Sequence, residues 1–257
     1  MNQTLKCACS AVAGVLLALA GPAFGQDTAA PAVVAPDRPD FSNGIQIVPV
    51  GHVQVEGGVT AIRSGGTTDL SVGELTVRIP LAATFEVGVQ VYSWGATWGS
   101  ETSDGPRDPA VDVKWKLVDT DATDFGVILG TSVPTGVRAN GEPHFQPFAA
   151  LSVDRVVSEK VSFTVNAGAV AASAGGETFG ELFGGLSASF QASPKVSLFL
   201  ELFGWSRTEP GGPGEQVIDG GLQYLVTNRL MLDVHLGAGF GRTASDGFLG
   251  LGASYLF

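Results

Sequence analysis

The pair Asp233 and His235 is the first place in this sequence where side chains could do chemistry. A carboxylate next to an imidazole, together with a serine, is the arrangement found in hydrolytic triads. Residues two apart in a strand share one face, so both side chains would lie in the same environment. The sequence has no Gly-x-Ser-x-Gly motif, the turn that exposes a catalytic serine in many hydrolases. We therefore interpret the pair as inward-facing polar residues and predict no catalytic residue and no enzyme activity.

Other candidate sites lack the spacing that their chemistry requires. The histidines His52, His144 and His235 are far apart, whereas a metal site needs several ligands close together. Asp119–Asp124 contains three carboxylates but not the glycine and glutamate of a calcium-binding loop. Gly237–Gly241 is rich in glycine, yet it lies within a strand pattern and no helix follows it. We predict neither a metal nor a cofactor.

Composition limits the remaining classes of function. The net charge is -11, and no basic stripe is present that could contact phosphate, so we predict no nucleic-acid partner. Charged residues make up only 15% of the 257 residues, against about 25% in ordinary globular chains. Together with 36 glycines, this favours many strands, tight turns and a surface that does not face water everywhere. The only cysteines are Cys7 and Cys9.

The elements that position these residues are strands with two different faces. Residues 247–257 alternate strictly, with Leu249, Leu251 and Tyr255 on one side and small residues on the other. About twelve such segments, each roughly ten residues long, follow one another from about residue 47. Their polar faces would line a lumen if the sheet closes, and the charged candidates for that lining are Arg78, Asp112, Lys114, Lys116, Glu201, Asp219, Asp233 and His235.

The connections decide between a soluble sandwich and a membrane barrel. Long connections such as 97–108 and 172–181 alternate with short ones such as 82–84 and 192–195. This alternation is typical of external loops and periplasmic turns in outer-membrane barrels. We therefore predict an all-β fold: one antiparallel transmembrane β-barrel of about 12 strands, with both termini on the short-turn side. Its lipid-facing aromatic residues would form a girdle near those turns.

The two ends of the chain carry distinct signals. Residues 1–25 have the charged, apolar and small-residue regions of a secretory signal peptide. Residues 26–46 are rich in Pro and Ala, and we predict an extended periplasmic segment there, followed by the barrel at 47–257. Tyr255 and Phe257 end the last strand, and by resemblance to other outer-membrane barrels they form the signal for the barrel assembly machinery. The predicted location is the outer membrane, with its lipid as a partner.

Five stretches resemble a family of bacterial outer-membrane transporter-like barrels named for the meta-cleavage pathway of phenol degradation. The resemblance implies a barrel that passes small molecules, and it supplies no catalytic residues. The stretches, which span nearly the whole mature chain, are Asp37–Ser42, Asp112–Lys116, Thr131–Gly136, Asp219–Tyr224 and Leu232–Gly239.

The sequence is compatible with two functions. The first is a channel through which small solutes, including aromatic or hydrophobic ones, cross the outer membrane by passive diffusion. The second is a structural or adhesive barrel with a plugged lumen and loops that bind partners. Because a barrel of about twelve strands is intermediate between a filled interior and a wide channel, strand number permits either.

Overall fold

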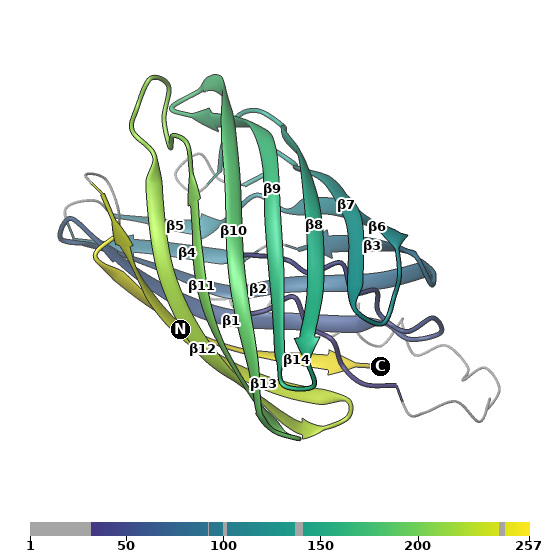
Figure 1. Cartoon of the computed structure of the whole chain (residues 1–257). Coiled ribbons are helices and arrows are strands. Elements are labelled where there is room, and N and C mark those ends of the chain that lie inside the picture. The colour runs from purple at the N-terminus through teal and green to yellow at the C-terminus, as the bar shows by residue number, and fades with distance from the viewer. Residues whose placement is uncertain (1–31, 92, 100–101, 137–140, 242–244) are drawn as a thin grey trace. The chain divides into compact units, whose positions relative to one another are not determined.

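The computed structural model describes residues 32–257 apart from 92, 100–101, 137–140 and 242–244, so the predicted signal peptide lies outside the described residues. The described chain is all-β (Figure 1), and none of its segments is a helix long and apolar enough to cross a membrane. Its strands are β1 (Gln54–Ser64), β2 (Thr67–Ala82), β3 (Phe85–Gln90), β4 (Trp94–Trp98), β5 (Ser103–Pro106), β6 (Ala110–Val118), β7 (Thr123–Ser132), β8 (Gln146–Ser158), β9 (Val161–Ala174), β10 (Glu177–Ser193), β11 (Val196–Trp205), β12 (Glu215–Thr227), β13 (Leu230–Phe240) and β14 (Gly247–Leu256).

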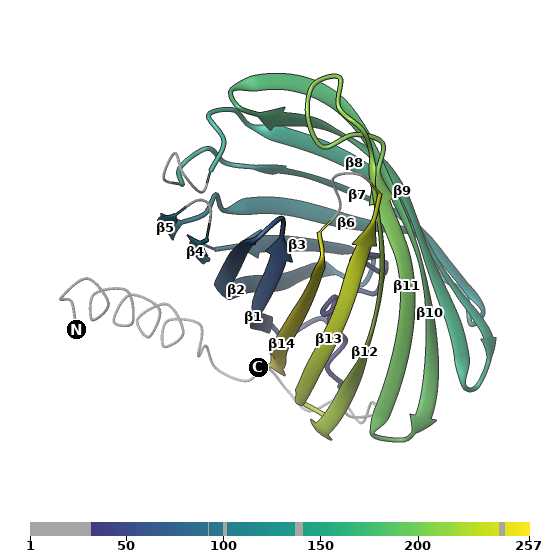
Figure 2. The same ribbon diagram turned by 90° about the vertical axis from the view of Figure 1, so that its left-hand side faces the viewer.

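Twelve of these strands form a closed antiparallel barrel, as predicted. From β6 to β14 each strand pairs with the next one in sequence, and β3 joins β2 to β6. The ring closes because β1 pairs with β2 on one side and β14 on the other (Figure 2), with Val59 opposite both Val72 and Leu251. Closure gives the first and last strands partners, so neither is left as an open edge.

The two remaining strands, β4 and β5, form a hairpin on the first half of β2. β3 pairs with residues 76–82 of β2, whereas β4 pairs with residues 68–72 further along the same edge. Part of the long connection predicted at 97–108 is therefore strand. The connection predicted at 172–181 is also shorter than expected, because β9 and β10 continue to the turn at Gly175 and Gly176. Both glycines have positive φ, the backbone conformation that such a tight turn requires.

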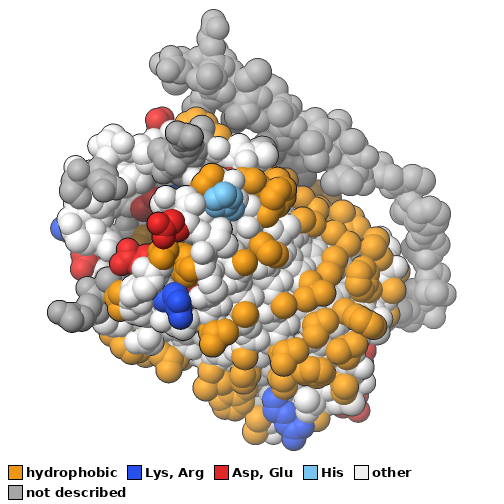
Figure 3. All heavy atoms as spheres, turned by 90° about the horizontal axis from the view of Figure 1, so that it is seen from above, with side chains coloured by type: hydrophobic (Ala, Val, Ile, Leu, Met, Phe, Trp, Pro, Cys, Tyr) orange, Lys and Arg blue, Asp and Glu red, His pale blue; other side chains and the backbone are white. Residues whose placement is uncertain are grey.

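The faces of the barrel wall follow the alternation in the sequence. In β11, for example, Leu200 is 59% exposed while its neighbour Glu201 is 1% exposed. Hydrophobic side chains spread over much of the outer strand surface in Figure 3, with few charged groups among them. Charged and polar side chains instead form most of the buried set, the inverse of a soluble domain.

The predicted aromatic girdle is present on the outer face. Trp115, Phe190, Tyr224 and Tyr255 are all substantially exposed, and each lies near the short-turn end of its strand. Tyr255 and Phe257 contact each other edge to face, with ring centroids 4.7 Å apart.

Candidate functional site: the barrel lumen

Residues 32–49, here called the lumen segment, lie among the inward-facing side chains of the barrel. Their conformation is extended, as the prolines predicted. The periplasmic placement of residues 26–46 stays a prediction, and the structure adds contacts between residues 35–48 and inward-facing side chains of the wall. The physical reason for these contacts is that the closed wall supplies buried acceptors for backbone N–H groups that an extended chain otherwise exposes. Residues 26–31 lie outside the described part of the chain.

Four acidic side chains of the wall accept hydrogen bonds from the backbone of this segment. Glu201 accepts from two consecutive amides, Phe41 N and Ser42 N, each at 2.7 Å. Glu56 accepts from the amides of Asp37 and Arg38 at 3.1–3.2 Å. The other two acceptors are Asp154, which binds Ile45 N at 2.8 Å, and Glu86, which binds Val48 N at 2.7 Å.

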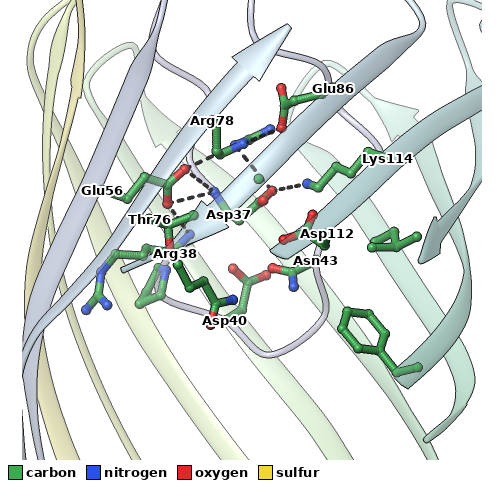
Figure 4. Close-up of a pocket in the computed structure, with 15 residues that line it drawn as sticks. Asp37, Arg38, Asp40, Asn43, Glu56, Thr76, Arg78, Glu86, Asp112 and Lys114 are labelled. Atoms are coloured by element: carbon green, nitrogen blue, oxygen red, sulfur yellow. Dashed lines mark hydrogen bonds and ion pairs between the residues drawn. The ribbon is translucent and has the colours of Figure 1, made fainter. Parts of the chain in front are cut away.

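A buried ionic cluster joins the segment to β2, β3 and β6 (Figure 4). Arg78 is 1% exposed, and it contacts Glu86 at 2.7 Å and Glu56 at 3.1 Å. Asp37 of the segment bridges the two basic residues, lying 3.3 Å from Arg78 and 2.5 Å from Lys114. Because every charge in this cluster has an opposite partner, the lumen wall near β2 and β6 is compensated rather than freely basic.

Segment carbonyls complete the coordination of the basic residues. Arg78 donates to Ala35 O at 2.6 Å and to Gln46 O at 2.8 Å, while Lys114 donates to Gly44 O at 2.8 Å. Arg78 therefore contacts carbonyls close to both ends of the segment. A cavity of about 200 Å³ remains beside this cluster, lined by polar groups that include Asp112 and Thr76.

Arg38 anchors the segment at the place where the barrel closes. Its guanidinium lies 2.9 Å from Glu74 on β2 and 3.5 Å from Asp233 on β13. It occupies space over Gly58 and Gly252, where an added Cβ would collide with the guanidinium. Glycine at these two paired positions therefore makes room for the arginine.

Apolar contacts hold both halves of the segment. Val34 and Val48 pack with Leu256 in one fully buried cluster next to the last strand. Ile45 packs with Ile128 and Ala150 in another. Such contacts inside a polar lumen contribute roughly 1.5–3 kcal/mol for each large side chain buried.

Two larger cavities flank Phe41 of the segment and Trp205 of β11. One has a volume of about 380 Å³ and extends toward Phe248 and His235; the other, about 390 Å³, extends toward Phe148 and Phe183. Both are bordered by aromatic rings, and Phe41 stacks on Phe203 with centroids 4.6 Å apart. A lumen that is polar near Arg78 thus becomes aromatic on the other side of the segment.

Seven of the eight predicted lumen residues are buried, and Asp112 borders the cavity beside Arg78; that they line a lumen stays a prediction. Arg78 and Lys114 belong to the ionic cluster with Asp112 beside it, whereas Lys116 pairs separately with Asp119 and Asp124. Glu201 holds the segment, Asp233 contacts Arg38, and Asp219 lies next to His235 on neighbouring strands. The candidates therefore divide into five local groups, each with its own partners.

Sequence reasoning missed the residues of the lumen segment, above all Asp37, Arg38 and Phe41. A signal was available in Ile45 and Val48, which are apolar residues in a stretch otherwise typical of a solvated linker. The predicted absence of a metal site stays a prediction; within the described residues, no three His, Cys, Asp or Glu side chains are grouped to hold a metal.

The comparisons with known proteins agree with this architecture. The family model described as "Putative MetA-pathway of phenol degradation" matches residues 36–257, which include most of the lumen segment and the whole barrel. The chain belongs to this family. The sequence resemblance to this family is thus confirmed. A search of curated proteins found no match.

Solved structures show the same fold at low sequence identity. The COG4313 outer membrane channel from Pseudomonas putida F1 is 14% identical and superposes with a TM-score of 0.68, over 87% of this chain and 100% of that one. The KdgM porin is 10% identical with a TM-score of 0.55, over 79% of this chain and 98% of that one. The NanC porin is similar at 10% identity and a TM-score of 0.54, with the same coverage. These likenesses establish the outer-membrane barrel fold.

Proposed function

We propose that this protein is an outer-membrane channel that lets small solutes, including aromatic or hydrophobic ones, cross by passive diffusion. The observation that carries the proposal is the closed barrel with lipid-compatible side chains outside and cavities of about 380 and 390 Å³ inside. Cavities of this size accommodate small molecules. The solved channels and porins that share the fold support the same class of function.

In this proposal the lumen segment narrows the pathway, and the eight inward residues contribute to its lining or hold the segment in place. The outward apolar side chains face lipid, and Tyr255 with Phe257 serves as the signal for the barrel assembly machinery. The proposed location is the outer membrane, and catalysis has no part in the function.

The test is electrical recording from the protein refolded into planar bilayers. We expect small single-channel currents that are interrupted reversibly when an aromatic solute enters the lumen. A variant with a weakened segment, Arg38→Ala, loses the contacts with Glu74 and Asp233 and should conduct more.

The second candidate, a structural or adhesive barrel with a plugged lumen, is favoured by the many contacts between wall and segment. The same recordings separate the two. A correctly folded barrel that carries no current, either as wild type or as Arg38→Ala, would overturn the channel and favour the plugged barrel.

A further inference from the structure

The cavity between the lumen segment and strands β11–β14 combines aromatic walls with a polar floor. Phe41, Phe203 and Trp205 form one wall, with Phe203 and Trp205 meeting edge to face at 5.5 Å between ring centroids. Phe248 of β14 borders the cavity as well, and its ring lies 5.4 Å from that of His235. Its volume of about 380 Å³ falls within the range of small-molecule sites.

Two polar side chains in this cavity lack the partners that burial normally demands. The Asp219 side chain is 2% exposed and the His235 side chain 11%, and Asp219 Oδ2 lies 3.8 Å from His235 Nδ1. Among the described residues, neither Asp219 Oδ1 nor either ring nitrogen of His235 has a hydrogen-bond partner. An unsatisfied buried polar group costs about 1–3 kcal/mol, so a molecule that satisfies these groups would be bound favourably.

Glycines beneath these side chains keep the cavity clear. A Cβ at Gly250 would collide with the imidazole of His235, and one at Gly237 would collide with Asp219 and Phe248. Since neither position carries a Cβ, the three side chains lie close against the barrel wall. The space that they would otherwise fill is left to the cavity.

The charge around the cavity selects among ligands. Asp40, Glu215 and Asp219 line it, whereas no lysine or arginine does so in the part of the chain that the structure describes. The carboxylates of Glu215 and Asp219 repel an anion, and they accept hydrogen bonds from a neutral or cationic donor. A ligand with a ring and a donor group therefore fits, and a ring with a carboxylate does not.

We infer that this cavity is a binding site for single-ring aromatic molecules that carry a neutral hydrogen-bond donor, such as a hydroxyl or amino group. The ring lies among Phe41, Phe203 and Trp205, and the donor group bonds to Asp219 with His235 beside it. The inference deepens the proposed channel function, on which it rests, by naming the solute class and its site.

The test uses three matched probes and ¹⁹F NMR of the refolded full-length barrel: 4-fluorophenol, 4-fluorotoluene and 4-fluorobenzoate. Phenol and toluene rings are nearly equal in shape, so their difference reports the donor group. We expect the phenol to bind roughly tenfold more tightly than the toluene, as for one hydrogen bond to a charged acceptor. The benzoate should bind more weakly than either.

Variants locate the site. Asp219→Leu should make the affinities for the phenol and the toluene about equal, because the acceptor is lost while an apolar side chain of similar size remains. Gly250→Ala, which pushes His235 into the cavity, should weaken both the phenol and the toluene. Glu181→Gln is the matched control: it removes a carboxylate from the neighbouring cavity and should keep the preference.

The outcomes separate this inference from the channel itself. A barrel that conducts but binds the three probes equally, or that keeps its preference in both Asp219→Leu and His235→Leu, overturns the binding site alone. A barrel that shows the preference but carries no current overturns the channel and leaves the site standing. If Asp219→Leu does not fold, His235→Leu decides the point, since His235 lies beside Asp219 and borders the same cavity.

Discussion

Replacing Glu201 by glutamine tests how the barrel wall holds the lumen segment. Each carboxylate oxygen of Glu201 accepts one segment amide, Phe41 N or Ser42 N, at 2.7 Å, and the side chain is 1% exposed. Glutamine of the same shape offers one oxygen, so its NH₂ group would face the other amide, donor against donor. The loss of one buried hydrogen bond to a charged group is worth about 1.5–3 kcal/mol.

This free energy predicts a measurable change in local opening. At about 1.4 kcal/mol for each factor of ten, the opened population around Phe41 and Ser42 should rise roughly 10- to 150-fold. Amide hydrogen exchange reports that population directly for groups that exchange only when opened. We expect Glu201→Gln to accelerate exchange at these two amides while the strands of the barrel stay protected.

The control is Glu181→Gln, which neutralises another buried lumen carboxylate on the neighbouring strand β10. Among the described residues, the lumen segment donates no hydrogen bond to Glu181, so exchange at Phe41 and Ser42 should not change. Unchanged exchange at these amides in folded Glu201→Gln would refute the argument, because the carboxylate would then contribute nothing to holding the segment. Equal acceleration in both variants would mean that lumen charge in general, and not this contact, is responsible.

Three further predictions concern the barrel itself. Arg78→Met should lower the free energy of unfolding by about 3–5 kcal/mol, because Glu56 and Glu86 keep buried charges without their partner. Chemical unfolding in vesicles measures this free energy. The double variant Arg78→Met/Glu86→Gln should recover part of the loss. Leu200→Arg should lower the free energy of unfolding by about 2–4 kcal/mol in the same assay, because Leu200 is an outward-facing side chain. Leu200→Phe should be tolerated. Equal effects of the two substitutions would mean that this face does not meet lipid. Deletion of Phe257 should reduce the amount of barrel in cell membranes more than it reduces refolding in detergent, and equal losses would limit its role to packing.

The wall of the barrel could be predicted from sequence because its pattern is local. Alternation has a period of two, so a register shift of one residue would place Lys114 in lipid and Val113 in the lumen. Burying a lysine in lipid costs free energy, so each residue keeps to one face wherever the two sides of the sheet meet different environments. The outward aromatic girdle and the interior position of the charged residues follow from this rule, and the number of ring strands follows from the count of alternating segments. Strand lengths were less predictable, since β9 and β10 continue past the point where their alternation weakens.

Which wall residues hold the lumen segment was decided by the tertiary structure. Ser42 and its acceptor Glu201 are separated by 159 residues, and Asn43 O accepts from Asn166 across 123. No local sequence pattern predicts these hydrogen bonds, because the backbone groups of an extended, proline-rich chain can form hydrogen bonds with water equally well. Only in the closed barrel do buried carboxylates from separate strands lie close enough to accept hydrogen bonds from one short stretch of backbone. The sequence by itself determined on which side of the barrel wall each residue lies. The groups that the inward side chains contact were determined only by the folded barrel.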